Sequence, residues 1–259
     1  MYIGKVFAAS AGVIGIGLGI VYGLSHFGAE ATNPSSLLDS SPIEEIILLT
    51  DGVLPDEWIT ERLELPEGVG LMNVDIDGMK NRLEAEGQVK SAVITRDFSG
   101  GSLVVSLHEE VPVIRLMARS KDGKSMLMVV GRDGSVYRGH GYSRQLLRGL
   151  PFLDGVRLVR NKDGFKPISG VAKISELLQL TREDAPHLYR TWKVVSLIDS
   201  PRLIVKTKDI SEIVFEPGNF RRQLAKLDYI LDYYRRDPRE RMDRIDLSFR
   251  DQVAVEVEL

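Results

Sequence analysis

The sequence predicts an α+β protein with a single N-terminal transmembrane helix, followed by two domains that each combine a β-sheet with helices. Three observations lead to this fold class. Val6–Phe27 contains no charged side chain, several later segments alternate apolar and polar residues, and Phe220–Tyr234 carries apolar residues at helical spacing. Hydrophobic residues at 43% and charged residues at 27% are ordinary for globular domains with their own cores.

The uncharged segment Val6–Phe27 is long enough for a membrane helix. At roughly 1.5 Å per residue it would reach about 33 Å, against a hydrocarbon core of about 30 Å. Lys5 precedes it, and acidic residues such as Glu30 and Asp39 follow it. The positive-inside bias therefore predicts a cytoplasmic tail at 1–5 and an extracytoplasmic remainder, located at the cell (inner) membrane.

Two features of this N-terminal region leave alternatives open. Ala29-Glu30-Ala31 has the small-x-small form of a signal-peptidase site, so cleavage at Ala31 competes with a retained anchor. Small residues also recur at i, i+4 spacing, which predicts a ridge that could pack against a partner helix in lipid. The alternative is that these glycines reflect only the general abundance of glycine in membrane helices. The ridge residues are Ala11, Gly15, Gly19 and Gly23.

Charge and cysteine content exclude several classes of protein. The formal net charge of −3 argues against a general nucleic-acid binder. The absence of cysteine excludes disulfides, thiolate nucleophiles and thiolate metal sites. The chain is therefore expected to bind no nucleic acid and to use no cysteine chemistry.

After a polar linker at 28–42, residues 43–112 predict a first domain with the order strand, helix, helix, strand, strand. The expected strands are Ile43–Leu49, Val89–Arg96 and Ser102–Glu109, the last two joined by a glycine-containing hairpin turn. One helix follows Pro55 and carries Trp58, Ile59 and Leu63, and the other covers Ile76–Glu86. A small sheet with both helices on one face would bury these apolar residues.

Residues 113–259 predict a second, mixed β-sheet domain with helices. The helices are expected over Val171–Leu180 and Phe220–Tyr234. Strand patterns occur at Val113–Met117, Met126–Val130, Ser135–Arg138, Trp192–Ile198, Leu203–Thr207, Glu212–Glu216, Arg244–Phe249 and Gln252–Leu259.

The sequence contains no catalytic constellation. The histidines His26, His108, His140 and His187 lack zinc-site spacing, and no nucleophile elbow or P-loop is present. We therefore expect no enzymatic activity, no cofactor, no metal and no small-molecule substrate.

Two features predict binding instead. Gln252–Leu259 alternates apolar and acidic residues at the chain end, where an edge strand could accept a partner strand. It is equally possible that neighbouring segments of the chain cover this strand, or that its acidic side chains prevent a partner strand from pairing with it. Several arginines also follow the last predicted helix. They indicate either a solvated helix end, where positive charge is favourable, or a binding site for an acidic partner. These arginines are Arg235, Arg236, Arg239, Arg241 and Arg244.

Several motifs, in this order, resemble the bacterial cell-division family FtsQ, also called DivIB. The region from Leu65 to Val113 is similar to that family's POTRA domain, a βααββ unit, with Gln88–Arg96 and Leu103–Pro112 as its markers. Asp133–Tyr137 and Leu150–Gly155 are similar to its downstream β domain, as is the helix Phe220–Tyr234. The segment Glu110-Val111-Pro112 departs from the Glu-Arg that often precedes the family's proline.

The resemblance implies a non-enzymatic bitopic scaffold of the divisome at the division septum, with FtsB- and FtsL-like division proteins as partners. It implies that the C-terminal strand pairs with an FtsB-like segment through Val253, Ala254, Val255, Glu256, Val257 and Leu259. Arg190, Trp192 and Phe249 would support that contact.

Two other functions are alternatives. POTRA domains also serve as chaperones or assembly factors in outer-membrane protein export, which would require a long β-barrel after Pro112. An envelope enzyme acting on cell-wall polymer would require paired carboxylates or a metal cluster in a cleft, and the sequence shows neither.

Overall fold

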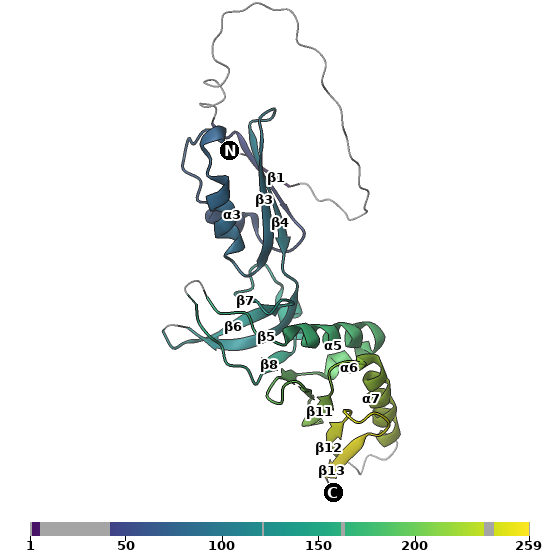
Figure 1. The fold of residues 1–259 in the computed structure, drawn as a ribbon. Helices are drawn as coiled ribbons and strands as arrows, with labels where there is room; N and C mark the ends of the chain where they lie inside the picture. The colour runs from purple at the N-terminus through teal and green to yellow at the C-terminus, as the bar shows by residue number, and fades with distance from the viewer. Residues whose placement is uncertain (1, 6–41, 121, 162–163, 236–240, 259) are drawn as a thin grey trace, which may run out of the picture. The chain divides into compact units, whose positions relative to one another are not determined.

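The computed structural model describes residues 2–5, 42–120, 122–161, 164–235 and 241–258. The described chain forms two compact units. The first comprises the described residues up to Glu84 together with Val89–Glu109, and the second comprises Ala85–Gln88 and the chain from Glu110 onward. Both units combine sheets with helices (Figure 1), so the fold is of the mixed α+β class.

The first unit is a four-stranded sheet with strand order β1-β2-β4-β3 and helices packed on it. Strand β2 is parallel to its neighbours β1 and β4, whereas β3 and β4 form an antiparallel hairpin. The elements are β1 (Tyr2–Lys5), β2 (Glu45–Thr50), α2 (Asp56–Leu63), the 3₁₀ turn η1 (Leu71–Asn73), α3 (Ile76–Glu84), β3 (Val89–Asp97) and β4 (Ser102–Glu109).

Alternation along the strands selects the residues that form the core of this unit. Leu103, Val105 and Leu107 of β4 are buried, while the residues between them are only partly covered. Trp58 of α2 and Leu83 of α3 belong to the same hydrophobic cluster. The helices therefore cover the face of the sheet to which the strand periodicity directs the apolar side chains.

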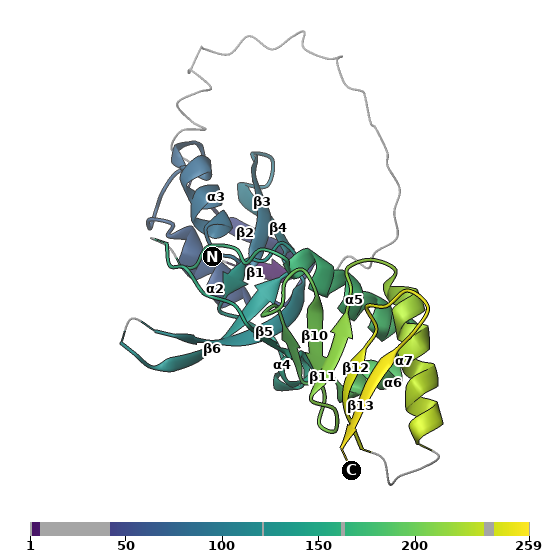
Figure 2. The ribbon, with the colours of Figure 1, turned by 60° about the horizontal axis from the view of Figure 1, so that its bottom comes forward.

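The second unit is built on one nine-stranded sheet with strand order β13-β12-β11-β10-β9-β8-β5-β6-β7. Figure 2 shows β10 to β13 side by side with α7 next to them. The strands are β5 (Pro112–Arg119), β6 (Ser125–Gly131), β7 (Val136–Tyr137), β8 (Phe152–Asp154), β9 (Val194–Ser196), β10 (Leu203–Lys206), β11 (Glu212–Phe215), β12 (Arg241–Asp246) and β13 (Ala254–Glu258). The helices are α4 (Arg144–Gly149), α5 (Val171–Asp184), α6 (Pro186–Thr191) and α7 (Phe220–Tyr234).

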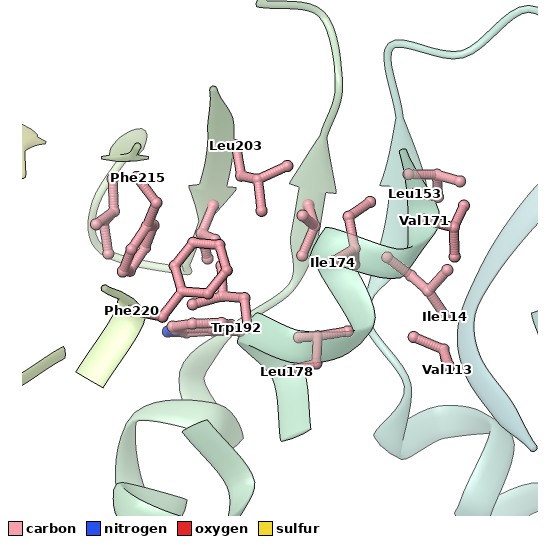
Figure 3. Packing of buried hydrophobic residues seen from close by; sticks show 14 of the residues in the cluster. Val113, Ile114, Leu153, Val171, Ile174, Leu178, Trp192, Leu203, Phe215 and Phe220 are labelled. Carbon is pink, nitrogen blue, oxygen red and sulfur yellow. The ribbon is translucent and has the colours of Figure 1, made fainter. Parts of the chain in front are cut away.

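The core of the second unit lies between this sheet and helices α5, α6 and α7. Along α5, the buried residues Ile174, Leu177 and Leu178 recur at the spacing of one helix face. The Trp192 and Phe215 rings lie 5.7 Å apart between centroids, and Phe220 of α7 packs edge-on to Phe215 at 6.5 Å (Figure 3). Aromatic packing thus fastens α7 to the strands on which the C-terminal edge is built.

The prediction of an N-terminal transmembrane helix is corrected. Within the ranges that the structure describes, no helix combines the length and the apolar character needed to cross a bilayer. The longest, α7, has fifteen residues, or roughly 22 Å, and its outer face is charged. Val6–Phe27 and the linker before Pro42 lie outside the described residues, and Tyr2–Lys5, expected in a cytoplasmic tail, instead pair in parallel with β2 as strand β1.

Candidate functional site

Strand β13 forms one edge of the nine-stranded sheet. It pairs antiparallel with β12, from Arg241 opposite Glu258 to Asp246 opposite Ala254. Its other side pairs with no strand in the part of the chain that the structure describes. An edge strand in this position presents a row of backbone N–H and C=O groups that a further strand could use.

The two faces of β13 differ in chemistry. Val255 lies opposite the fully buried Ile245 and Val257 opposite Met242, so the valines share the face that α7 covers. Val257 is nevertheless 38% exposed. Glu256, on the other face, has a side chain that is 71% exposed. The edge therefore offers one apolar and one acidic face to a partner.

Side chains of helix α7 bind the loop at 249–252, which leads into β13. The ammonium group of Lys226 donates hydrogen bonds to the backbone oxygens of Phe249 and Arg250, both at 2.8 Å, and to that of Gln252 at 3.3 Å. Arg222, one turn earlier, binds the Asp251 carboxylate at 2.7 Å. The apolar side of α7 is buried in the core, so these two cations position the loop before β13 from a fixed element.

Arg244 ties β13 into the sheet on its acidic face. Its guanidinium lies 3.5 Å from Glu212 of β11 and 4.0 Å from Glu256 of β13. A third carboxylate, that of Asp246, lies at 3.8 Å. Of the arginines that the sequence grouped together, Arg244 is thus engaged in a cross-strand network, whereas Arg236 and Arg239 lie outside the described residues.

A hollow of about 490 Å³ lies beside β12, beneath α7. Its wall is mainly apolar, with Leu227 and Leu231 from α7, Ile213 from β11 and Met242 from β12. Because Met242 lies opposite Val257 in the strand register, this hollow adjoins the apolar face of β13.

The residues expected to support the partner contact lie at different depths. Phe249 is 51% exposed in the loop that Lys226 clamps. Arg190 is exposed on α6, where its Nε donates to the carbonyl oxygen of Pro186 at 3.3 Å. Trp192 is 4% exposed and packs in the core (Figure 3).

Val253 is partly buried against the core, directly before β13. Leu259 lies outside the described residues, as does the proposed small-residue ridge at Ala11, Gly15, Gly19 and Gly23.

Among the described residues, no group of three or more histidine, cysteine, aspartate or glutamate side chains could hold a metal ion. Two of the histidines form pairs with single carboxylates, His108 with Asp51 at 3.0 Å and His187 with Asp228 at 2.7 Å. The side chains of both pairs are about half exposed, and His187 also lines the hollow beneath α7.

Sequence reasoning missed the residues that position the edge. In the sequence, Lys226 is one of several cations that flank the apolar stripe of an amphipathic helix. Its contact with the loop at 249–252 could not be predicted, because the two segments are more than twenty residues apart. The signal that could have identified it is weak: Lys226 lies on the border of the apolar stripe, where a long side chain can reach a neighbouring element.

A comparison with protein-family models finds no match to this chain, and a comparison with curated proteins also finds none. The resemblance to the FtsQ/DivIB family therefore rests on the sequence motifs themselves.

Proposed function

We propose that this protein is a non-enzymatic scaffold of bacterial cell division that resembles FtsQ/DivIB and binds FtsB- or FtsL-like partners through strand β13. Under this proposal it acts at the division septum, on the extracytoplasmic side. The motifs that resemble the family suggest the process, and the open edge at β13 supports the mode of binding.

The single observation that carries the proposal is the state of that edge. Strand β13 is held on one side by β12 and clamped at its start by Lys226, so its backbone is ordered before any partner arrives. Ordering a strand in advance lowers the conformational entropy lost on binding. The main-chain hydrogen bonds of strand addition then supply affinity, and alternate side chains supply specificity.

The chemistry of β13 defines what a partner strand should carry. A strand added to this edge continues both faces of the sheet. Its residues on one face would pack beside Val255 and Val257 and are expected to be apolar. On the opposite face, a lysine or arginine beside Glu256 would complement the exposed carboxylate.

A proline scan of β13 tests strand addition. Single substitutions to proline at Ala254, Val255, Glu256 and Val257 each remove one backbone N–H, and successive N–H groups point alternately toward β12 and outward. Proline is tolerated on an edge strand where its nitrogen faces outward. We therefore expect alternation: two variants keep their stability but lose pull-down of the FtsB-like protein, and the other two lose stability.

Alanine at Glu256 and Val257 is the matched control, since it removes side chains and keeps every N–H. Loss of stability in all four proline variants, or undiminished binding by the two that remain stable, contradicts strand addition. The cellular part of the proposal is checked by depletion and microscopy: filamentation is expected, and normal septation refutes a role in division.

A further inference from the structure

A second surface of the second unit brings several positively charged side chains together. It is a groove between α4 and α6, across the N-terminal ends of β8 and β9, with a volume of about 370 Å³. Four cations line it, namely Arg115, Arg148, Arg190 and Lys193, together with the rings of Phe152, Tyr189 and Trp192. Among the residues that the structure describes, no aspartate or glutamate contributes to its lining.

The groove continues into a neighbouring hollow of about 780 Å³. The two share Gly149, Leu150, Tyr189 and Arg190. The second adds Arg182, and its lining contains no carboxylate from the described part of the chain. By contrast, the hollow beneath α7 includes Asp209 among its charged residues. The absence of acid is therefore a property of this groove and not of every concave surface on the unit.

Arg115 is held in the groove by contacts that leave its charge uncompensated. Arg115 of β5 lies opposite Phe152 of β8 in the strand register. Its guanidinium carbon lies 4.1 Å from the centre of the Phe152 ring. One terminal nitrogen donates to the backbone oxygen of Arg148 at 3.4 Å, and the buried Nε has no hydrogen-bond partner among the described residues. Burial and, second, the positive charge of Arg148 lower the pKa of Arg115 from its usual value.

The other cations of the groove are also without carboxylate partners within the described chain. Arg148 and Lys193 are exposed and form no ion pair there, and Arg190 bonds a backbone carbonyl. Elsewhere on the same unit, exposed arginines form ion pairs with carboxylates, as Arg222 does with Asp251. A set of neighbouring guanidinium and ammonium groups with apolar walls fits carboxylates arriving from outside.

We propose that this groove binds an acidic segment of a partner protein, whose carboxylates pair with Arg115, Arg148 and Lys193. Apolar wall residues such as Leu146, Leu150 and Pro186 suit a peptide, which carries apolar side chains between its acids. A nucleic acid would require a longer basic surface, and the chain has a net charge of −3.

The groove shares Arg190 and Trp192 with the residues expected to support the partner contact, but its other cations, Arg115, Arg148 and Lys193, lie apart from the β13 edge. Strands β9 and β13 are four steps apart in the sheet order, which corresponds to roughly 19 Å at the usual spacing between strands. A variant of β13 that loses its FtsB-like partner should therefore keep the groove, so the failure of one surface is distinguishable from the failure of the other.

Fluorescence anisotropy with the full chain and a labelled hexaglutamate peptide tests the proposal. The double variant Arg148→Glu, Lys193→Glu changes two exposed side chains and is expected to weaken hexaglutamate binding at least tenfold. The matched control Lys173→Glu, Lys208→Glu makes the same change of net charge at exposed positions outside the groove and should stay within twofold of the unchanged protein. Binding should also weaken with added salt.

Three results would overturn the proposal. Hexaglutamine, the uncharged probe, could bind as tightly as hexaglutamate. The two double variants could weaken binding equally, which would show a general effect of net charge. Inorganic phosphate could bind at the groove while hexaglutamate does not, which would assign it to a phosphate-bearing ligand.

Discussion

The two edges of the nine-stranded sheet are built in opposite ways. Strand β7 ends one side with two residues, Val136 and Tyr137, which are 8% and 4% exposed. Strand β13 ends the other side with five residues and an outer edge that no described strand covers. Both edges carry valine, so apolar composition alone does not distinguish them.

Neighbouring backbone and side chains close the β7 edge. The Tyr137 hydroxyl donates to the carbonyl oxygen of Glu110, and the carbonyl oxygen of Gly134, just before β7, accepts from the amide of Ile168 at 2.9 Å. Gly134 itself has φ +88, and a side chain there would collide with the Ile168 carbonyl group. A short, covered edge resists strand addition, whereas a longer, uncovered one permits it. Coverage of the edge by neighbouring residues, and not its sequence pattern, therefore decides which edge can bind a further strand.

The largest expected effect comes from opening the closed edge. Tyr137→Ala should lower the free energy of unfolding by about 3–5 kcal/mol, because it removes a buried ring and leaves a cavity. Urea denaturation measures this change. The matched control is Tyr229→Ala on the exposed side of α7, where the tyrosine is 72% exposed and the change should stay within about 0.5 kcal/mol. Equal effects of the two substitutions would show that β7 is not a packed edge.

An intermediate effect is expected from releasing the open edge. Lys226→Ala removes three hydrogen bonds to the loop before β13, although water can replace them at the surface. We expect hydrogen exchange of the β13 amides to accelerate about tenfold, equivalent to 1.4 kcal/mol of local opening, with a smaller change in global stability. Lys226→Met keeps the aliphatic stem and should show the same acceleration. If only the alanine variant exchanges faster, packing of the stem holds the loop and the hydrogen bonds do not.

The smallest effect is expected for the ion pairs on the acidic face of β13. Arg244→Ala should lower the free energy of unfolding by less than about 1 kcal/mol, since its carboxylate partners are at 3.5–4.0 Å and partly exposed. The difference should largely vanish in 1 M salt, where charges are screened within about 3 Å. A larger loss that persists in salt would mean that the Arg244 stem is a packing element of the edge.

Long, strongly periodic elements could be predicted from the sequence. The helix expected over Phe220–Tyr234 and the strand expected over Ser102–Glu109 have the bounds of α7 and β4. Each has an uninterrupted apolar pattern that a single helix face or sheet face can bury.

Short elements could not be predicted in the same way. Helices α4 and α6 have six residues each and strand β8 has three, too few for periodicity to be visible. Strand β12 occupies Arg241–Asp246 rather than Arg244–Phe249, because Phe249 belongs to the loop clamped by α7 and a bulge shifts the register after Met242. The membrane helix was expected from hydropathy over Val6–Phe27, which the described residues do not include.

Local spacing along a helix or strand dictates its buried face, so the amphipathic segments and the side chains that enter a core follow from the sequence alone. The sequence also indicated that the C-terminal segment is a strand with one acidic and one apolar face. The position of β13 at an edge, the burial of β7, and the meeting of Arg115, Arg148 and Lys193 in one groove follow from the tertiary fold. These outcomes depend on pairings between residues far apart in the chain, and local periodicity carries no information about the neighbour that a strand will find.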